Sequence, residues 1–164
     1  YESYLPEMMM AAEAWEGAMK GLGPKIMAAG GERKKAGKVV LGTVAGDIHS
    51  IGKNIVGAML KMSGFEVYDL GIDVPASRFV TKAEEVGADV IAASALMSTT
   101  MTQQKNIIEH LNARGVRAKY AVLVGGGSTT QDWAEQIGAD GYGRTAGDAA
   151  TLAIKAVAKK GGKK

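Results

Sequence analysis

The feature that most constrains the fold is a regular alternation of short apolar runs and longer amphipathic runs over most of the chain. The strand-like runs are 38–44, 65–70, 89–94, 120–124 and 140–143. Helix-period patterns fill the intervals, near 51–63, 76–87, 101–114, 129–137 and 146–159. Strands that are apolar throughout are buried on both faces of a sheet, and strands that alternate with helices pair in parallel. The pattern therefore predicts an α/β fold with a doubly wound, five-stranded parallel sheet.

The segment before this alternation has a different pattern. Residues 1–20 are rich in Met and Ala and predict one helix, which we expect to end at Gly21, Gly23 and Pro24. Residues 28–38 are typical of a linker. We therefore expect a helical segment and linker over 1–37, and a main domain with a basic C-terminal tail over 38–164.

Composition narrows the function classes. The chain has 164 residues, of which 46% are hydrophobic, so it can bury one good core. Its net charge is only +3, with much of the basic excess in 33–35 and 159–164, and aromatic residues make up 5%. These values favour solvated segments over a nucleic-acid interface. There is no cysteine, which excludes disulfides and thiolate sites. No run of 18 apolar residues is present, so we expect a cytoplasmic protein without a membrane partner.

The residues that could bind a ligand or take part in chemistry follow the ends of the predicted strands. A flavodoxin-like sheet of this kind binds ligands at the carboxyl ends of its strands. Asp47 and His49 follow the first strand, Ser94 ends the third, and glycines 125–127 follow the fourth. We therefore expect these residues to meet at one edge of the sheet.

Two common phosphate chemistries do not fit the GDIHSIGKN stretch. In a phosphate-binding P-loop, Asp47 would replace the first glycine and Asn54 the magnesium-binding hydroxyl. A phosphoacceptor receiver requires an aspartate where this chain has Ser94. Two structural alternatives stay open at this point: His49 is held by a helix-capping Asp47, and the glycines simply turn a strand into a helix. His110 is off the apolar stripe of its helix and is expected to be solvated.

Three separated motifs occur together at fixed intervals. The chain has D-x-H-x-x-G at 47–52, then 41 residues, S-x-L at 94–96, then 28 residues, and G-G at 125–126. This series resembles the cobalamin-binding domain of methionine synthase and, more closely, the corrinoid proteins of anaerobic methyltransferase systems. The resemblance extends through DLGIDVP at 69–75 and covers residues 38–158.

The resemblance implies a cobalamin whose dimethylbenzimidazole tail has left cobalt and is buried in the protein. His49 would then be the lower axial cobalt ligand, Asp47 would accept a hydrogen bond from its other ring nitrogen, and the Thr100 hydroxyl would complete the relay. The remaining cofactor contacts implied by the family lie beside these motifs. They are Ile48, Ser50, Ile51, Gly52, Ser94, Leu96, Ser98, Thr99, Gly125, Gly126, Gly127, Tyr142 and Gly143. Of these, Tyr142 is equally explained by packing at the edge of the core.

The same resemblance implies a methyl carrier rather than a complete enzyme. A substrate:corrinoid methyltransferase would load a methyl group onto cob(I)alamin, giving methylcobalamin. A second methyltransferase would pass the group to a pterin or thiol, and a reductive activation partner would maintain the cofactor.

The main alternative is the cobalamin-binding subunit of an adenosylcobalamin-dependent isomerase, and a cobalamin-dependent sensor is a further one. SALMSTTM at 94–101 is closer to the carriers. YLPEMMMAAEAW at 4–15 resembles the last helix of a carrier's four-helix cap, so we expect a remnant of that cap in a fragment or a trimmed chain.

Overall fold

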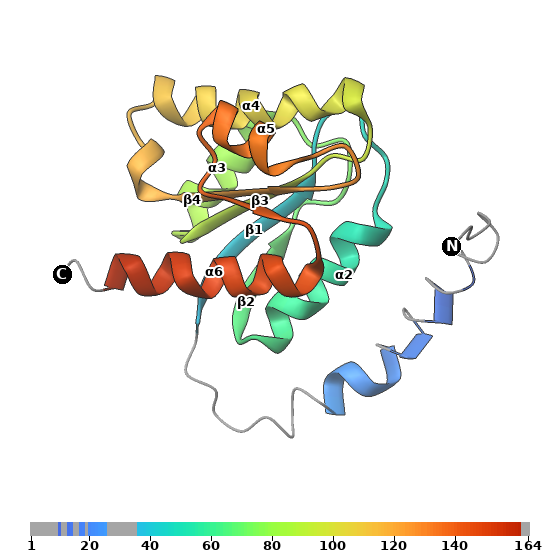
Figure 1. Ribbon diagram of the computed structural model, residues 1–164. Helices are drawn as coiled ribbons and strands as arrows, with labels where there is room; N and C mark the ends of the chain where they lie inside the picture. Colours follow the sequence, from blue (N-terminus) through green and yellow to red (C-terminus); the bar gives the residue numbers. More distant parts are fainter. Residues whose placement is uncertain (1–9, 11–12, 15–16, 19, 26–35, 162–164) are drawn as a thin grey trace. The chain divides into compact units, whose positions relative to one another are not determined.

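The computed structural model describes residues 10, 13–14, 17–18, 20–25 and 36–161 (Figure 1). The chain divides into two compact units, Tyr1–Lys34 and Lys35–Lys164. In the first unit every described residue is helical, and the helix continues through Gly21 and Gly23 to Lys25. The expected end at Gly21 and Gly23 is therefore wrong, because glycine weakens a helix by about 1 kcal/mol without forbidding it. Pro24 is helical as well, and the residues that directly follow Lys25 lie outside the described ones. The rest of the predicted helix and most of the linker lie outside the described residues.

The second unit is an all-parallel sheet with helices on both faces (Figure 1). Its strands have the order β2-β1-β3-β4-β5, which confirms the predicted flavodoxin-like fold. The strands are β1 (Gly37–Thr43), β2 (Phe65–Asp69), β3 (Val90–Ser94), β4 (Ala121–Gly125) and β5 (Gly141–Gly143). The helices are α2 (Ile51–Met62), α3 (Ala76–Val86), α4 (Ser98–Ala113), the 3-10 turn η1 (Arg117–Lys119), α5 (Gln131–Ile137) and α6 (Ala146–Gly161).

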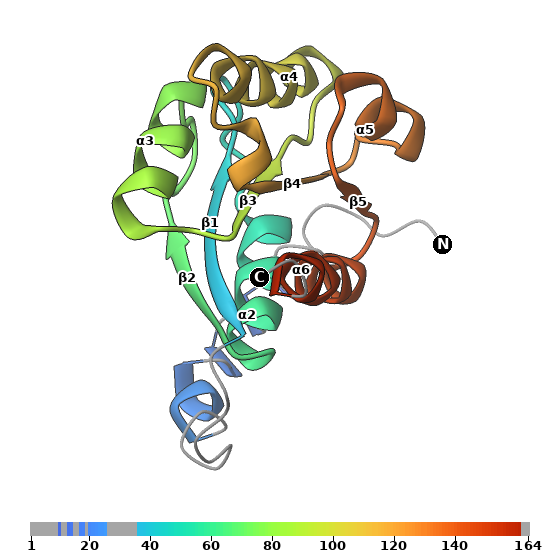
Figure 2. The same ribbon diagram turned by 90° about the vertical axis from the view of Figure 1, so that its left-hand side faces the viewer.

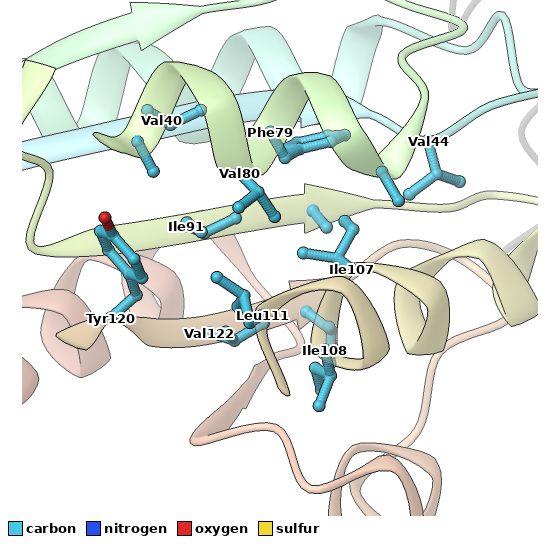
Figure 3. Close-up of a cluster of buried hydrophobic side chains, with 14 of the residues drawn as sticks. Val40, Val44, Phe79, Val80, Ile91, Ile107, Ile108, Leu111, Tyr120 and Val122 are labelled. Carbon is cyan, nitrogen blue, oxygen red and sulfur yellow. The ribbon is translucent and has the colours of Figure 1, made fainter. Parts of the chain in front are cut away.

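Each face of the sheet has its own apolar core. Figure 2 shows α3, α4 and α5 on one face and α2 and α6 on the other. Val40, Ile91 and Val122 point to the first face, where they pack with side chains of α3 and α4 (Figure 3). Their neighbours Val39 and Val90 belong to the second core. This alternation explains why the strands are apolar at every position.

The largest difference from the predicted elements is the start of α4, which begins at Ser98 rather than near residue 101. Serine and threonine are unfavourable in the interior of a helix because their hydroxyl groups bond to nearby backbone groups. The same hydrogen bonds are favourable at the start of a helix. Thr100 does this, since its Oγ1 lies 3.0 Å from the carbonyl oxygen of Met97. Ser98, Thr99 and Thr100 are therefore the first turn of a helix and not a loop.

The topology brings the carboxyl ends of four strands into one row. Thr43 of β1 pairs with Ser94 of β3, Ser94 with Gly125 of β4, and Gly125 with Gly143 of β5. After β1 the chain enters α2 on one face, whereas after β3 it enters α4 on the other (Figure 2). The loops that follow β1 and β3 therefore diverge at the switch point where such sheets bind ligands. Within the part of the chain that the structure describes, no helix combines the length and apolarity needed to cross a membrane.

Candidate functional site

The carboxylate of Asp47 joins the β1–α2 loop to the β3–α4 loop. Its side chain is fully buried and accepts five hydrogen bonds. Oδ1 receives the backbone N–H of His49 at 3.1 Å and lies 2.7 Å from its ring Nδ1. Oδ2 receives the backbone N–H groups of Leu96 at 2.7 Å and Met97 at 3.3 Å, and the Thr100 hydroxyl at 2.7 Å. Both oxygens are thus saturated with donors, which is the condition that makes a buried carboxylate tolerable.

These donors decide the charge of Asp47. Burial alone raises the pKa of the carboxyl group, but hydrogen bonds from Thr100, from the ring and backbone of His49 and from the backbone of Leu96 outweigh it. The pKa of Asp47 therefore lies well below its usual range, and the group is a carboxylate. A carboxylate only accepts hydrogen bonds, so Nδ1 of His49 must hold the proton that joins them.

The other ring nitrogen of His49 is the free one. The side chain of His49 is 47% exposed, and no hydrogen bond of Nε2 is found among the described residues. The Thr43 hydroxyl donates to the backbone carbonyl of His49 at 2.9 Å, which fixes the base of the residue. The result is an imidazole with a set tautomer that presents an open nitrogen lone pair to the outside.

Apolar side chains are exposed around this imidazole. Among the described residues, five of the eight exposed large hydrophobic side chains lie at the carboxyl edge of the sheet. They are Ile48 (70% exposed), Leu96 (45%), Ile51 (43%), Ile72 (43%) and Met97 (37%). A concentration of this kind in a chain with well-filled cores indicates a surface that receives an apolar ligand or partner.

The glycines after β4 are required by the chain's own backbone. A Cβ at Gly126, which has φ +118°, would lie 2.0 Å from the carbonyl oxygen of Ala95. A Cβ at Gly125 would lie 2.9 Å from the Gly143 carbonyl oxygen, and one at Gly127 would lie 2.7 Å from a methyl group of Leu96. The glycines therefore bring the loops after β3 and β4 into close contact, whatever room they also leave for a ligand.

A buried glutamine holds the same two loops together, and the sequence analysis did not single it out. Nε2 of Gln104 donates to the backbone carbonyls of Ala93 and Gly125, each at 3.0 Å. Its Oε1 accepts from the Trp133 indole at 3.0 Å and from the Thr129 hydroxyl at 3.3 Å. A polar residue at a core-facing position of α4 was the available signal, because a buried amide needs partners for both its ends.

Next to this network lies a polar atom that lacks a partner. Ser128 Oγ is buried and is the one such side-chain atom found without a hydrogen-bond partner in the described residues. It directly follows the three glycines. A ligand group that entered beside this loop would supply the missing partner.

The remaining predicted residues are spread around the edge. Ser94 is half-buried at the end of β3, whereas Ser98 and Thr99 are exposed on α4. Ser50 precedes α2 without a side-chain cap bond, and Gly52 has open space around it. Tyr142 packs against the larger core, as the structural alternative proposed, and Gly143 lies close to Ala149. His110 is exposed on α4, as predicted.

The family of the chain follows from a match to the B12 binding domain, which extends over residues 37–151. The chain belongs to the B12-binding family. The match begins with β1 and includes every loop that forms the site described above. It confirms the resemblance drawn from the three spaced motifs.

Individual B12-binding relatives are similar over nearly the whole chain. A corrinoid protein of Desulfitobacterium hafniense is 54% identical over 159 residues, which cover 96% of this chain and 74% of that protein. The structure of the Methanosarcina barkeri monomethylamine corrinoid protein matches with a TM-score of 0.76 and 36% sequence identity. The match covers 94% of this chain and 72% of that protein. A chain of the methanol:cobalamin methyltransferase complex of the same organism matches with a TM-score of 0.72 and 35% sequence identity. The match covers 95% of this chain and 58% of that one.

The residues at the edge of this B12-binding domain fit a corrinoid. The described residues contain no group of three or more His, Cys, Asp or Glu side chains that could hold a metal ion by themselves. A metal that arrives inside a macrocycle needs only an axial ligand from the protein, and Nε2 of His49 is a free imidazole nitrogen. Ile48, Ile51 and Leu96 are exposed in the segments that flank His49 and follow β3, and Ser128 Oγ is a buried polar atom in the loop after β4.

Proposed function

We propose that this chain is a methyl carrier that binds cobalamin with His49 in place of the cofactor's own lower base. The observation that supports this most strongly is the exposed imidazole, held through Nδ1 by the saturated Asp47 carboxylate with Nε2 left open. When bound, the cofactor supplies a cobalt centre that accepts and releases a methyl group. The protein's contribution is to hold, orient and tune that centre.

Each side chain of the proposed site has a separate task. His49 would hold the cobalt through Nε2, and Asp47 sets the tautomer that leaves Nε2 open. Thr100 holds the Asp47 carboxylate from the first turn of α4 at 2.7 Å, and Asp47 in turn holds the imidazole through Nδ1. The hydroxyl has one proton and two acceptors within 3.0 Å, and the charged Asp47 oxygen is the stronger of them.

The apolar side chains and the glycine loop would bind the rest of the cofactor. Ile48, Ile51, Leu96 and Met97 are exposed beside His49, where they would underlie the macrocycle and keep water from it. Ser94, Gly125–Gly127 and Ser128 line the neighbouring strand ends, where the displaced nucleotide tail would lie. Gly52, Ser98, Thr99 and Gly143 would contribute at the periphery.

The partners follow from the same role. One methyltransferase would load the methyl group from a small donor, of the kind that the relatives' names give as monomethylamine or methanol. A second would pass it to a pterin or thiol, and a reductive partner would restore an oxidised cofactor. Transfer of a ¹³C-methyl label from such a donor to the loaded chain, in the presence of its cognate methyltransferase, tests the role. A label that stays on the donor contradicts it.

The binding mode has a sharper test in electron paramagnetic resonance of the chain loaded with cob(II)alamin. We expect cobalt lines split into triplets by one axial ¹⁴N, and into doublets when histidine is labelled with ¹⁵N. The chain has two histidines, so His110→Ala is a matched control for His49→Ala. With ¹⁵N-labelled histidine, His49→Ala should abolish the doublets, while His110→Ala should keep them. A triplet in His49→Ala would come from the cofactor's own base, so the assignment is rejected if the ¹⁵N doublets survive in His49→Ala or disappear in His110→Ala.

A further inference from the structure

The loop that follows β2 contains a residue in an unusual backbone conformation. Asp73 has φ 52° and is the one non-glycine residue of the described chain with a positive φ. Asp and Asn tolerate this left-handed region better than other side chains, but it still costs free energy. Such a conformation persists only where surrounding contacts require it.

The contacts of Asp73 are with the loop that holds His49. Its Oδ1 accepts the backbone N–H of Gly46 at 2.7 Å, and its own N–H donates to the backbone carbonyl of Asp47 at 3.0 Å. The left-handed conformation directs both groups of one residue to the two ends of the Gly46–Asp47 segment. Gly46 itself has φ +77° and lies in a turn outside any helix or strand, which the Asp47 N–H closes by donating to the Val44 carbonyl at 3.1 Å.

The β1–α2 loop is therefore held from two sides. From the β3 side, the N–H groups of Leu96 and Met97 and the Thr100 hydroxyl hold the carboxylate of Asp47. From the β2 side, Asp73 holds the backbone around it. One set of bonds comes from the segment that follows β3 and the other from the loop that follows β2, so the two neighbours of β1 in the sheet both supply contacts to the loop that carries His49.

We propose that Asp73 is a positioning residue that clamps the Gly46–Asp47 turn and so aims His49 at its ligand. This inference rests on the proposed function for the identity of the ligand. The hydrogen bonds of Asp73 are formed by groups of this chain alone, so they can be measured without a bound cofactor. Asp73 is exposed, so its replacement should leave the core and the fold intact. Its effect is confined to the loop.

Three variants separate the hydrogen bond from the backbone conformation. Asp73→Asn keeps an acceptor oxygen and tolerates the left-handed region, Asp73→Gly keeps only the conformation, and Asp73→Ala loses both. In the metal-free chain we expect the Gly46 amide to exchange with solvent roughly three- to tenfold faster in the Gly and Ala variants, since one hydrogen bond is lost. Exchange in Asp73→Asn should stay within about twofold of wild type by the same argument. The Val44 amide, which bonds to Ser94 at 3.0 Å, is the internal control and should not change.

The loaded chain provides a second measurement. With cob(II)alamin bound and histidine labelled with ¹⁵N, the share of the signal that is split into doublets should fall by a similar factor in Asp73→Gly and recover in Asp73→Asn. Wild-type exchange and splitting in Asp73→Gly would overturn the inference, as would an equal loss in Asp73→Asn. If wild type itself shows no nitrogen splitting, the proposed axial ligand is wrong, and the amide exchange of the metal-free chain still decides whether Asp73 is a clamp.

Discussion

Replacing Gly126 with alanine should destabilise the chain by roughly 3 kcal/mol or more, although it adds a single methyl group. That methyl carbon would lie 2.0 Å from the Ala95 carbonyl oxygen and 2.8 Å from the Ala95 backbone nitrogen. The Ala95 nitrogen cannot move away without breaking its hydrogen bond to the Gly125 carbonyl oxygen at 2.9 Å, and φ at +118° is itself unfavourable for alanine. Urea unfolding of the metal-free chain, followed by circular dichroism, measures the loss.

Gly87→Ala is the matched control for the backbone contribution. Gly87 has φ +62° and ends α3, and no atom lies within 4 Å of the position that its Cβ would take. Its replacement by alanine should therefore lower the free energy of unfolding by only about 1 kcal/mol, which is the cost of placing alanine in the left-handed region. Equal losses in the two variants would show that the loops after β3 and β4 separate easily. The expected difference also means that bulky substitutions at Gly126 cannot test a nucleotide slot, because they would damage the fold first.

The second large effect is expected at Asp47. Asp47→Asn should lower the free energy of unfolding by about 3 kcal/mol, because several buried donors lose their acceptor at once. An asparagine amide has one oxygen and one NH₂ group, whereas both Asp47 oxygens receive donors. In either orientation the NH₂ group faces N–H or O–H donors. Asp132→Asn, at an exposed position in the first turn of α5, is the control and should change stability by only a few tenths of a kcal/mol.

The stability difference between wild type and Asp47→Asn should depend on pH. The folded pKa of Asp47 lies far below its ordinary value of 3.8, so the unfolded chain takes up this proton first on acidification. The stabilisation from the carboxylate is therefore complete above about pH 5, and it decreases as pH falls below about 4. Urea midpoints at pH 7, 5 and 3 should show a constant gap between the first two and a narrower gap at the third. A gap of the same size at pH 3 would contradict the assigned charge.

The sheet and its order were predictable because burial on both faces leaves a strong mark on sequence. A run such as residues 120–124 has no polar position, and helices between such runs leave few possible topologies. The meeting of Asp47, His49 and Ser94 at one edge follows directly from that topology. The start of α4 was not predictable, because its first turn consists of Ser98, Thr99 and Thr100, and Thr100 bonds to Asp47 of another loop.

Much of the site geometry is formed by backbone groups, which sequence patterns do not reveal. The N–H groups of Leu96 and Met97 bond to Asp47 because of the path of the chain and not because of their side chains. The same holds for the Ala95 carbonyl that makes Gly126 necessary. Asp73 was missed because its partners are likewise backbone atoms of another loop. Gln104 bonds to backbone carbonyls near the ends of β3 and β4 and to the side chains of Thr129 and Trp133, and sequence spacing does not reveal that these groups meet.

The β1–α2 loop is held by contacts from the segments that follow β2 and β3, and this has a consequence for protein engineering. A designer who transplanted residues 46–52 onto another five-stranded parallel sheet would move the imidazole and its carboxylate. Three of the five donors to that carboxylate come from residues 96–100, and the acceptor for Gly46 comes from residue 73. Without both neighbouring loops, the graft would bring a carboxylate whose Oδ2 lacks its donors and a histidine with no fixed direction. The smallest transferable module is therefore three loops and the strand ends that space them, rather than one linear motif.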